Sequence, residues 1–339
     1  MTYPRIWVMG GGRPGDMAQV YALAEELRLP FETRLLAYNW GFWLRGRFMG
    51  ASAISVRKDV REKTLLSPWP DLIILVGKRA VPVARWVKEQ SGGRTRLVLV
   101  GHPRVPAEHF DLVFTTRQYI PPEGASVRVQ PLTMSRFRQA PKLTDEEQAW
   151  LDSLPRPHLL LMIGGDTRHW TIRPRTIAGQ AAELAERAGR SGGSLIVVGS
   201  ARTSEDVLGA IEERLEAGFC EWRVVRHDFP RFGVLLGDAD ELFPTADSVS
   251  MISESVITGK PVGIVPVSRK LKGWLLLGSE SAVATNRTRD LRRFWKFVLD
   301  NRLAGTMEEP VASSTPNPVI EAARQVRDLL ERHLGKVPA

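Results

Sequence analysis

The sequence predicts an α/β protein built from two doubly wound, Rossmann-like domains. A chain of 339 residues is longer than one hydrophobic core usually serves, so two domains of about 150 residues each are expected. Short apolar segments alternate with helical ones, which indicates parallel sheets covered by helices on both faces. This alternation stops in a charged, proline-containing passage at residues 131–157 and then begins again. We therefore expect an N-terminal domain at residues 1–140 and a C-terminal domain at residues 155–310, with the cleft between them as the site.

The individual elements follow from the spacing of apolar residues. In the first half, strands are expected at residues 5–9, 32–36, 72–76, 97–100 and 112–115, and helices at 17–27 and 81–90. In the second half, strands are expected at 159–163, 194–198, 222–225 and 262–265, and helices at 176–190 and 204–217. An amphipathic helix at residues 318–334 closes the chain.

Residues 247–266 carry the most informative pattern of the chain: a hydroxyl-rich turn, a short helix, a Gly-Lys-Pro stop and an apolar strand. Ser248 or Ser250 can cap this helix, whose free N–H groups and positive dipole end then favour a phosphate. Glu254, which we expect in the first turn, could hold a ribose diol. The alternative is an ordinary capped helix with a solvated Glu254.

Two polar loops follow neighbouring strands of the predicted C-terminal sheet. Because the carboxyl ends of parallel strands meet at one edge, these loops can line a common anionic pocket. Their residues of interest are Gly164, Gly165, Asp166 and Arg168 in the first loop and Ser200, Arg202 and Thr203 in the second. Arg168 and Arg202 would neutralise a diphosphate there. Thr203 or Ser204 could equally be the N-cap of the next helix.

A glycine-rich loop follows the first predicted strand and opens the first helix. Its residues of interest are Gly12, Arg13, Gly15, Asp16 and Gln19, which we assign to the acceptor side. The spacing matches neither the dinucleotide-binding fingerprint nor a Walker loop. Asp16 could act as general base on an acceptor hydroxyl, or it could cap the first helix.

Two further polar residues follow other strands of the same domain. His102 could share proton transfer, or it could be a hydrogen-bonded turn residue. Lys78 would bring positive charge to the acceptor side, or it could simply be solvated. Asp16 is our first choice of catalytic base and His102 our second.

The chain is basic, with 47 Lys and Arg against 38 Asp and Glu. Two clusters place cations beside aromatic rings, one between Arg34 and Lys63. The other consists of Arg287, Arg289, Arg292, Arg293 and Lys296 with Phe294, Trp295 and Phe297. Such mixtures suit an anionic membrane surface, although the rings could instead be core and the charges solvated. No helix-turn-helix, RNP or zinc-finger pattern supports nucleic acid as a partner.

Apolar runs of about five residues are far shorter than a membrane span needs, and the N-terminus lacks the apolar region of a signal peptide. We therefore expect a cytoplasmic protein, peripheral on the inner face of the cytoplasmic membrane. The single cysteine, Cys220, cannot form an internal disulfide, and no Cys/His cluster has zinc-site spacing. Neither a metal nor a cofactor is expected.

Part of this pattern resembles the GT-B glycosyltransferase that adds N-acetylglucosamine to lipid-linked peptidoglycan precursors. The similar residues are Gly11, Gly12, Gly15 and Asp16 in the first loop and 250–266 in the second domain. That resemblance implies that Glu254 binds the ribose. The glycine-rich loop of that enzyme ends in His where this chain has Asp16, so its base chemistry does not carry over directly.

A longer resemblance is to the family named after the plant elongated-mitochondria fission protein, whose bacterial members are described as candidate glycosyltransferases of lipooligosaccharide assembly. The similar blocks are residues 12–19, 101–104, 164–169, 200–203 and 246–251. This resemblance implies a GT-B architecture and sugar transfer from a nucleotide-sugar donor to a lipooligosaccharide or other glycolipid acceptor. Ser250 and Met251 amides with Arg202 would then hold the diphosphate. A nucleotide-sugar epimerase of the same fold and a non-catalytic membrane-associated scaffold remain as alternatives.

Overall fold

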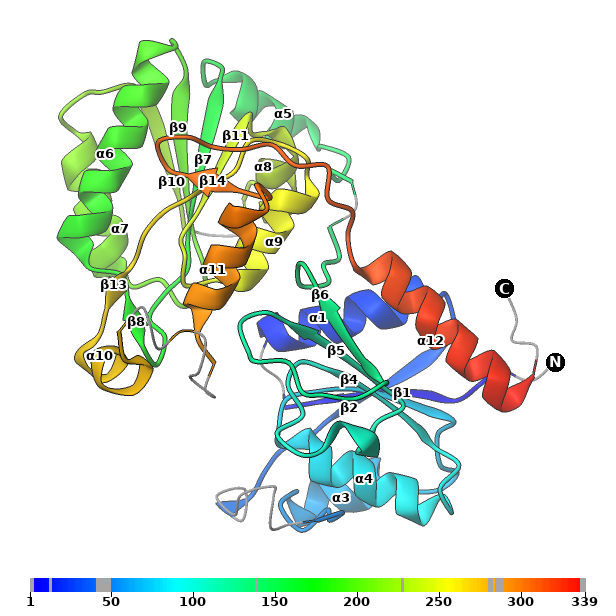
Figure 1. Cartoon of the computed structure of the whole chain (residues 1–339). Helices are drawn as coiled ribbons and strands as arrows, with labels where there is room; N and C mark the ends of the chain where they lie inside the picture. Colours follow the sequence, from blue (N-terminus) through cyan, green and yellow to red (C-terminus); the bar gives the residue numbers. More distant parts are fainter. Residues whose placement is uncertain are drawn as a thin grey trace. The chain divides into compact units, whose positions relative to one another are not determined.

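The computed structural model describes residues 3–11, 14–40, 50–137, 139–226, 229–279, 283 and 289–335. The chain divides into two compact units. Unit 1 holds the residues up to Arg136 together with those from Asn317 onward, and unit 2 holds Phe137–Pro316. The C-terminal helix α12 (Val319–Leu334) therefore belongs to the N-terminal unit, where it packs against α1 (Pro14–Glu26) (Figure 1).

Unit 1 is built around a six-stranded parallel sheet in the order β2-β1-β3-β4-β5-β6. Its strands are β1 (Ile6–Gly10), β2 (Phe31–Leu35), β3 (Leu72–Val76), β4 (Arg96–Val100), β5 (Leu112–Thr116) and β6 (Val127–Gln130). Alternate strand residues face opposite sides: Ile6 and Val8 join one core cluster with α1 and α12, while Trp7 and Met9 join another with α4 (Ala80–Gln90). Burial on both faces explains why β1 and β3 are almost wholly apolar. The remaining elements of this unit are α3 (Lys58–Thr64) and a 3₁₀ turn at Ala107–His109.

Unit 2 contains a four-stranded parallel sheet in the order β10-β9-β7-β11. Its strands are β7 (His158–Ile163), β9 (Ser194–Gly199), β10 (Glu221–Val225) and β11 (Glu241–Pro244). Parallel bridges Leu242–Val262 and Thr245–Val265 continue the sheet towards β12 (Gly263–Ile264), which pairs with β14 (Gly305–Thr306). The resulting order, numbered within the unit, is the 3-2-1-4-5-6 order of a Rossmann fold.

The helices of unit 2 are α5 (Asp145–Asp152), α6 (Pro174–Arg190), α7 (Glu205–Leu215), α8 (Phe232–Asp238), α9 (Val249–Ile257), α10 (Leu271–Leu277) and α11 (Leu291–Asp300). A short antiparallel pair, β8 (Trp170–Thr171) with β13 (Ser268–Arg269), lies outside the main sheet. Helices α6 and α7 cover one face together (Figure 1).

Most predicted elements are confirmed with ends that shift by one to three residues. Several elements were missed: α5 and β6, which fall in or beside the proline-containing passage, the helices α3, α8, α10 and α11, and the two-residue strands β8, β13 and β14. The predicted strand at residues 262–265 is reduced to β12 and two bridges. No helix among the described residues has the length and apolar character needed to cross a bilayer.

Among the residues it describes, the structure does not show the two basic-aromatic clusters as the exposed membrane-binding patches that the sequence suggested. Most of the first lies in residues 41–49, outside the described residues, although Trp40 is 81% exposed. The second is not a continuous exposed patch, because Phe294 and Arg292 are buried and Arg292 pairs with Asp290 at 2.7 Å. Arg287 lies outside the described residues. The amphipathic helix α11 directs these two side chains into the unit: the burial of Phe294 agrees with the alternative that the rings are core, whereas the burial of the Arg292 charge was not predicted.

Candidate functional site

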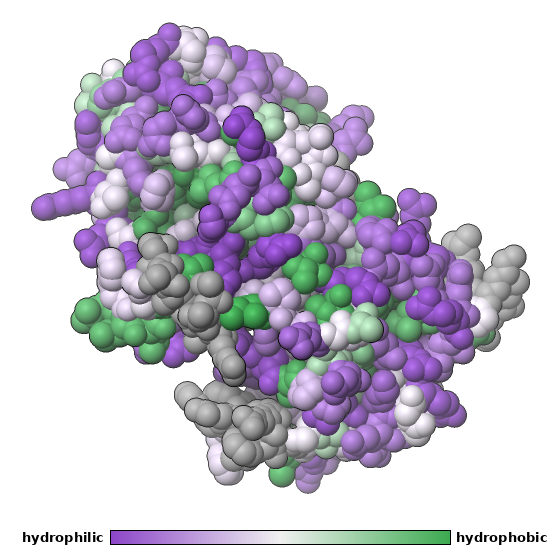
Figure 2. All heavy atoms as spheres, viewed as in Figure 1, coloured by the Kyte–Doolittle hydropathy of each residue, from purple (hydrophilic) through white to green (hydrophobic). Residues whose placement is uncertain are grey.

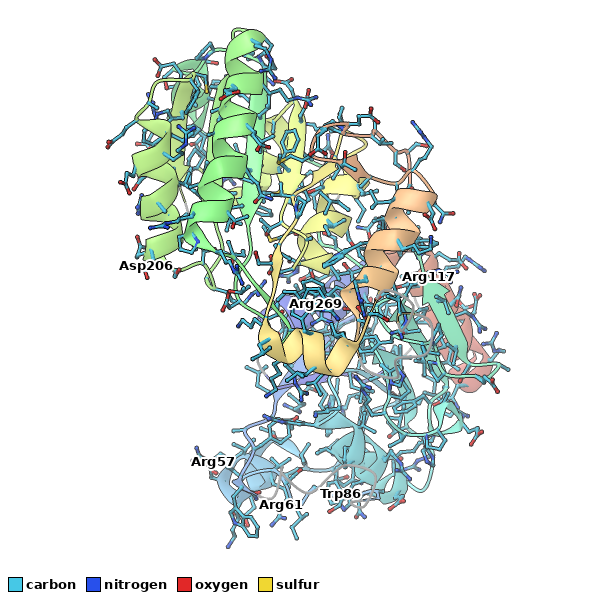
Figure 3. All side chains as sticks on the ribbon, turned by 60° about the vertical axis from the view of Figure 1, so that its left-hand side comes forward. Arg57, Arg61, Trp86, Arg117, Asp206 and Arg269 are labelled. Atoms are coloured by element: carbon cyan, nitrogen blue, oxygen red, sulfur yellow. The ribbon has the colours of Figure 1, made fainter. Side chains whose placement is uncertain are left out.

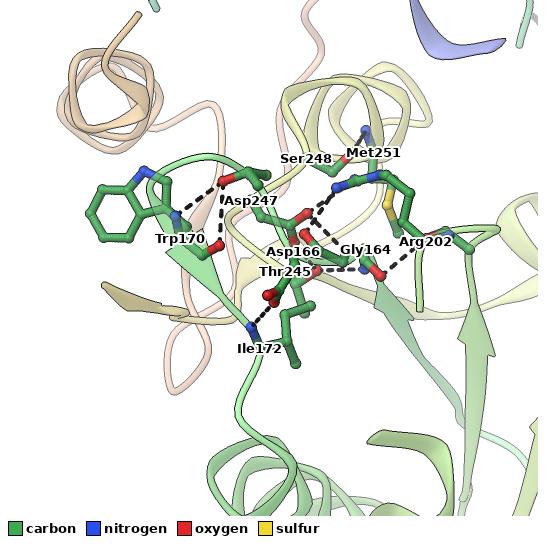
Figure 4. A network of polar contacts seen from close by, with 12 residues as sticks. Gly164, Asp166, Trp170, Ile172, Arg202, Thr245, Asp247, Ser248 and Met251 are labelled. Carbon is green, nitrogen blue, oxygen red and sulfur yellow. Dashed lines mark hydrogen bonds and ion pairs between the residues drawn. The ribbon is translucent and has the colours of Figure 1, made fainter. Parts of the chain in front are cut away.

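A buried carboxylate, Asp247, joins three loops at the carboxyl edge of the unit 2 sheet (Figure 4). It accepts hydrogen bonds from the Gly165 amide at 3.0 Å and from the Thr245 hydroxyl at 2.8 Å. The guanidinium of Arg202 donates to it at 3.0 Å. These partners come from the loops after β7, β11 and β9 respectively. Because a buried carboxylate is costly to leave without hydrogen-bond partners, these contacts hold the three loops in one arrangement.

The hydroxyls of the second loop strengthen the same junction. Ser200 donates to the Gly164 carbonyl at 3.0 Å, and Thr203 donates to it at 2.6 Å. The Gly164 amide in turn donates to the Thr245 hydroxyl at 2.9 Å. The helix that follows, α7, begins after Ser204 as N-cap. Ser200 and Thr203 therefore hold the protein's own loops together.

Gly164 and Gly165 are required by this close packing. A Cβ on Gly164 would lie 2.3 Å from an Asp247 carboxylate oxygen, and one on Gly165 would lie 2.3 Å from the Arg202 carbonyl oxygen. The space beside the two glycines is taken by the Asp247 carboxylate and by the Arg202 backbone.

Helix α9 begins directly after Asp247, with Ser248 as N-cap. The Ser248 hydroxyl accepts a long hydrogen bond of 3.4 Å from the Met251 amide. The predicted cap is thus confirmed at Ser248, while Ser250 lies inside the first turn. Glu254 is the sixth residue of the helix, so the expectation that it lies in the first turn was wrong.

One face of α9 is accessible and the other is core. Ile252 and Val256 are fully buried, as their i, i+4 spacing requires. Ser250, Met251 and Glu254 are only partly buried, and Ser250 and Met251 lie four and three residues before Glu254, which places both beside it on one stripe. This stripe combines a hydroxyl, amides near the positive end of the helix and a carboxylate, which are the groups we predicted for a nucleotide.

The two arginines of the loops have different surroundings. Arg202 already donates to Asp247 and to the Gly165 carbonyl, the latter at 2.9 Å. Arg168 is exposed and makes no hydrogen bond or ion pair with a residue that the structure describes. Arg168 is therefore the more available cation for an anionic ligand, whereas Arg202 is committed to holding the loops.

Asp166 is also committed to the framework. Its carboxylate pairs with Lys270 at 2.7 Å and accepts from Thr171 at 2.7 Å and from the Ile172 amide at 3.2 Å. Asp166 is exposed, but the neighbouring atoms displace some water from its carboxylate and oppose ionisation; the Lys270 and Thr171 hydrogen bonds outweigh this effect and lower the pKa of Asp166. Asp166 fixes the turn into β8, and its carboxylate oxygens are largely occupied by these three hydrogen-bond partners.

In unit 1, the structure describes part of the predicted acceptor-side loop. Pro14 occupies the first position of α1, and Asp16 lies in the first turn, so Asp16 is not the residue that precedes and caps the helix. Its carboxylate is partly exposed and makes no hydrogen bond or ion pair with the described residues. Gly15 is exposed and Gln19 is partly buried, while Gly12 and Arg13 lie outside the described residues.

His102 is poorly suited to act as a base. Its Nδ1 accepts the Arg104 amide at 3.1 Å, and its ring lies 5.2 Å from the Tyr119 ring. Burial lowers the pKa of His102 to about 4, and the neighbouring Arg104 charge acts in the same direction. The imidazole is neutral at physiological pH with one nitrogen already occupied, which fits the turn alternative better than proton transfer. Lys78 is exposed beyond the end of β3.

The sequence reasoning missed Asp247 as the central residue, although it opens the stretch that was singled out. The spacing Thr245-x-Asp247 after a buried strand is the signal that could have identified it. It also overlooked one Asp-x-Asp pair, Asp238 and Asp240. These carboxylates lie at the opposite end of the strands from the loops, where Arg156 pairs with them at 2.9 and 3.0 Å. They are part of a structural network that includes the buried His158.

Comparison with known proteins agrees with this architecture. A family model described as Mitochondrial fission ELM1 matches residues 14–332. The chain is 28% identical over 108 residues to an uncharacterized protein of Rickettsia prowazekii, and the match covers 32% of this chain and 30% of that relative. The chain thus spans less than a third of the length of this curated relative.

Solved structures share the fold at low sequence identity. The S. aureus MnaA–UDP co-structure has a TM-score of 0.53 at 12% identity, with 99% of both chains covered. A UDP-glucosyltransferase from Polygonum tinctorium has a TM-score of 0.53 at 13% identity, covering 97% of this chain and 99% of that one. A candidate UDP-N-acetylglucosamine 2-epimerase from Listeria monocytogenes has a TM-score of 0.50 at 12% identity, covering 99% and 98%.

These likenesses and the two α/β units with parallel sheets show that the fold is GT-B, as predicted. The family match spans nearly the whole chain and confirms the longer of the two resemblances found in the sequence. The chain belongs to the mitochondrial fission ELM1 family.

Proposed function

We propose that this chain is a glycosyltransferase that moves a sugar from a nucleotide-sugar donor to a membrane-linked acceptor such as a lipooligosaccharide or another glycolipid. The observation that carries the proposal is the accessible stripe of α9, which follows the Asp247 junction at the carboxyl edge of a Rossmann-type sheet. Open α/β sheets bind nucleotides at this edge. The GT-B fold, shared with proteins whose structures contain UDP or whose names include UDP-sugars, supports the same reading.

In this proposal the donor binds unit 2. Glu254 accepts the ribose hydroxyls, and the amides of Ser250 and Met251 face the diphosphate, which displaces the long 3.4 Å hydrogen bond from the Met251 amide to Ser248. Arg168 adds the positive charge that the Arg202–Asp247 pair cannot fully supply. Because the diphosphate leaves with more negative charge than it had in the donor, a helix N-terminus and an arginine aimed at it stabilise the transition state without requiring a cation.

The acceptor is assigned to unit 1. Its hydroxyl oxygen attacks the anomeric carbon, the bond from that carbon to the diphosphate oxygen breaks, and the hydroxyl proton passes to the Asp16 carboxylate. Asp16 is preferred over His102 because its carboxylate is unpaired among the described residues, whereas His102 is neutral and hydrogen-bonded through Nδ1. The acceptor side also includes Lys78, Gly15 and Gln19.

The experiment is a transfer assay with UDP-sugars and a glycolipid extract, run on the wild type, Asp16→Asn and His102→Gln. Removal of a general base lowers kcat by about 10²–10⁴-fold. Asp16→Asn should show this loss while nucleotide binding persists, and His102→Gln should keep most of the activity. Full activity of Asp16→Asn would exclude Asp16 as the base.

An epimerase is the second candidate, because one structural neighbour with a TM-score of 0.50 is described as a candidate UDP-N-acetylglucosamine 2-epimerase. An epimerase converts its nucleotide sugar without any acceptor. Conversion of UDP-N-acetylglucosamine to an isomer in a lipid-free buffer would favour this function over transfer. A chain that binds no nucleotide but retains membrane binding would instead be a scaffold.

A further inference from the structure

Helix α10 of unit 2 exposes more large apolar surface than any other described helix of its length. Leu271, Trp274 and Leu275 are 76%, 60% and 77% exposed, and their i, i+3 and i+4 spacing places them on one face. Leu276 beside them is 44% exposed. Figure 2 shows hydrophobic residues gathered where Figure 1 places α10. Single exposed leucines are ordinary, but a contiguous group of this kind marks an interaction surface.

The opposite side of α10 anchors it firmly. Leu277 is buried, and Gly273 packs so closely on the preceding loop that a Cβ there would lie 2.4 Å from the His169 carbonyl oxygen. The amide of Lys270, the N-cap, donates to that same carbonyl at 2.9 Å. The apolar face therefore points outward from a helix that is fixed on its inner side.

The surroundings of this face are cationic. Residues 269–278 contain Arg269, Lys270 and Lys272 and no acidic residue. The half-buried Arg269 guanidinium stacks over the Trp274 ring, 4.4 Å from its centre, donates a hydrogen bond to the Gly278 carbonyl, and lies beside α10 in Figure 3. Lys272 is exposed on the helix itself, while Lys270 is occupied by Asp166.

A groove of about 530 Å³ adjoins the helix and is lined, like its exposed face, by large apolar side chains and cations. Its lining includes three tryptophans, Trp170, Trp274 and Trp295, together with Leu299, Lys296 and Asp300, of which the last two form an ion pair at 2.9 Å. The Trp170 and Trp295 rings meet edge to face with their centres 4.6 Å apart. Tryptophan with lysine and arginine is the composition found at the depth of lipid headgroups.

We propose that α10, with Arg269 and Lys272, docks this chain on an anionic lipid bilayer. Seven residues are too few to span a bilayer, so the helix lies in the interface with its leucines among the acyl chains and its cations at the headgroups. A soluble polyanion would bind the cations but would leave the leucines and Trp274 without a partner. A purely apolar protein face would cover the leucines but would leave the cations without a partner. An anionic bilayer matches both. This inference deepens the proposed function, on which it rests for its biological purpose, by naming the surface that meets a membrane-linked acceptor.

Vesicle co-sedimentation of the full chain tests the inference. The wild type should sediment with phosphatidylglycerol/phosphatidylcholine vesicles, and less with phosphatidylcholine alone or in 0.5 M salt, about the concentration at which surface charges are screened. Leu275→Glu places a charge in the apolar face and should weaken binding at least about tenfold. Lys272→Glu should weaken binding to the anionic vesicles and remove most of its salt dependence. The matched control is Ile320→Glu on α12, an equally non-conservative change at a 61% exposed position, which should bind as the wild type does.

Melting temperatures and UDP binding of the same variants separate the possible failures. The inference would be overturned if the wild-type protein did not sediment with anionic vesicles. It would also be overturned if Leu275→Glu bound these vesicles as tightly as Ile320→Glu does. A wild-type dimer that Leu275→Glu converts to a monomer, without vesicle binding by either, would show that α10 joins two copies and would overturn it too. Vesicle binding by a chain that binds no nucleotide would reject the proposed transferase and leave the docking surface standing.

Discussion

The Arg202 guanidinium lies 3.0 Å from the buried carboxylate of Asp247, and this ion pair connects the loops after β9 and β11. The same carboxylate holds the Gly165 amide from the loop after β7. Arg202 therefore acts on any ligand mainly through the position of these loops. A cation that is not committed in this way, Arg168, lies in the same loop as Gly165.

The two arginines should consequently give opposite results when each is replaced by alanine. Arg202→Ala leaves Asp247 without its charged partner and should lower the free energy of unfolding by about 1–2 kcal/mol, a range reduced because the Arg202 side chain is 46% exposed. Arg168→Ala should leave stability unchanged and weaken nucleotide binding at least about tenfold, the loss of one charge-assisted contact. Urea unfolding and calorimetric titration with UDP measure both quantities. Equal effects of the two substitutions on stability would contradict the division of roles.

The close packing at Gly165 predicts a large cost for one methyl group. Gly165→Ala would bring a Cβ to 2.3 Å from the Arg202 carbonyl oxygen and should destabilise the chain by about 1–3 kcal/mol. Gly179→Ala is the matched control, since it lies inside α6 with open space around its Cβ. That change should stabilise the chain by about 0.5–1 kcal/mol through helix propensity. The melting temperatures of the two variants should move in opposite directions from the wild type.

The ion pair between Glu147 and Arg231 predicts a pH-dependent contribution to stability. Arg231 donates to Glu147 at 2.6 and 2.8 Å, and these hydrogen bonds lower the pKa of Glu147 to about 2. Because the folded pKa is below the ordinary value of about 4.3, the contribution is complete above that value and is lost as the pH falls from about 4.3 towards 2. Glu147→Gln preserves the capping box with Thr144 but removes the charge.

The difference in melting temperature between wild type and Glu147→Gln should therefore be constant from pH 8 to 6 and shrink steadily at acidic pH. Glu146→Gln, at an exposed position of the same helix turn, should show no such trend. A Glu147→Gln difference that persists unchanged at pH 3 would show that the charge of Glu147 does not stabilise the fold.

The main elements of the fold could be predicted because their signals are local. A buried parallel strand such as β3 is a continuous apolar run, and a helix such as α6 has a clear apolar stripe, so each is visible in the sequence alone. Helix α5 was missed because prolines on both sides suggested a linker, although Thr144 and Glu147 form a capping box that marks its start. Helix α10 was missed because seven residues carry too little periodicity to recognise.

The candidate site was harder to predict because its decisive contacts are not local. The loops were located correctly at the ends of β7 and β9. The sequence does not show, however, that the side chains of Asp166, Ser200 and Arg202 form hydrogen bonds within the protein. The Thr245-x-Asp247 spacing marks Asp247 as a candidate in the sequence, but its contacts with the loops after β7 and β9 follow only from the adjacency of β7, β9 and β11. Likewise, the cluster around Arg292 appeared to be a surface feature because the partner that buries it, Asp290, is only one of many nearby charges.

Calorimetric titration of UDP into the wild type and Glu254→Ala tests the central claim most directly, namely that α9 of unit 2 holds a nucleotide. Glu213→Ala, an exposed position on α7 of the same unit, is the control. We expect micromolar to millimolar binding by the wild type and by Glu213→Ala, and a loss of at least about tenfold in Glu254→Ala. Equal affinity of Glu254→Ala and wild type would contradict the assignment of the ribose to Glu254, and the absence of binding by all three proteins would contradict the nucleotide site itself.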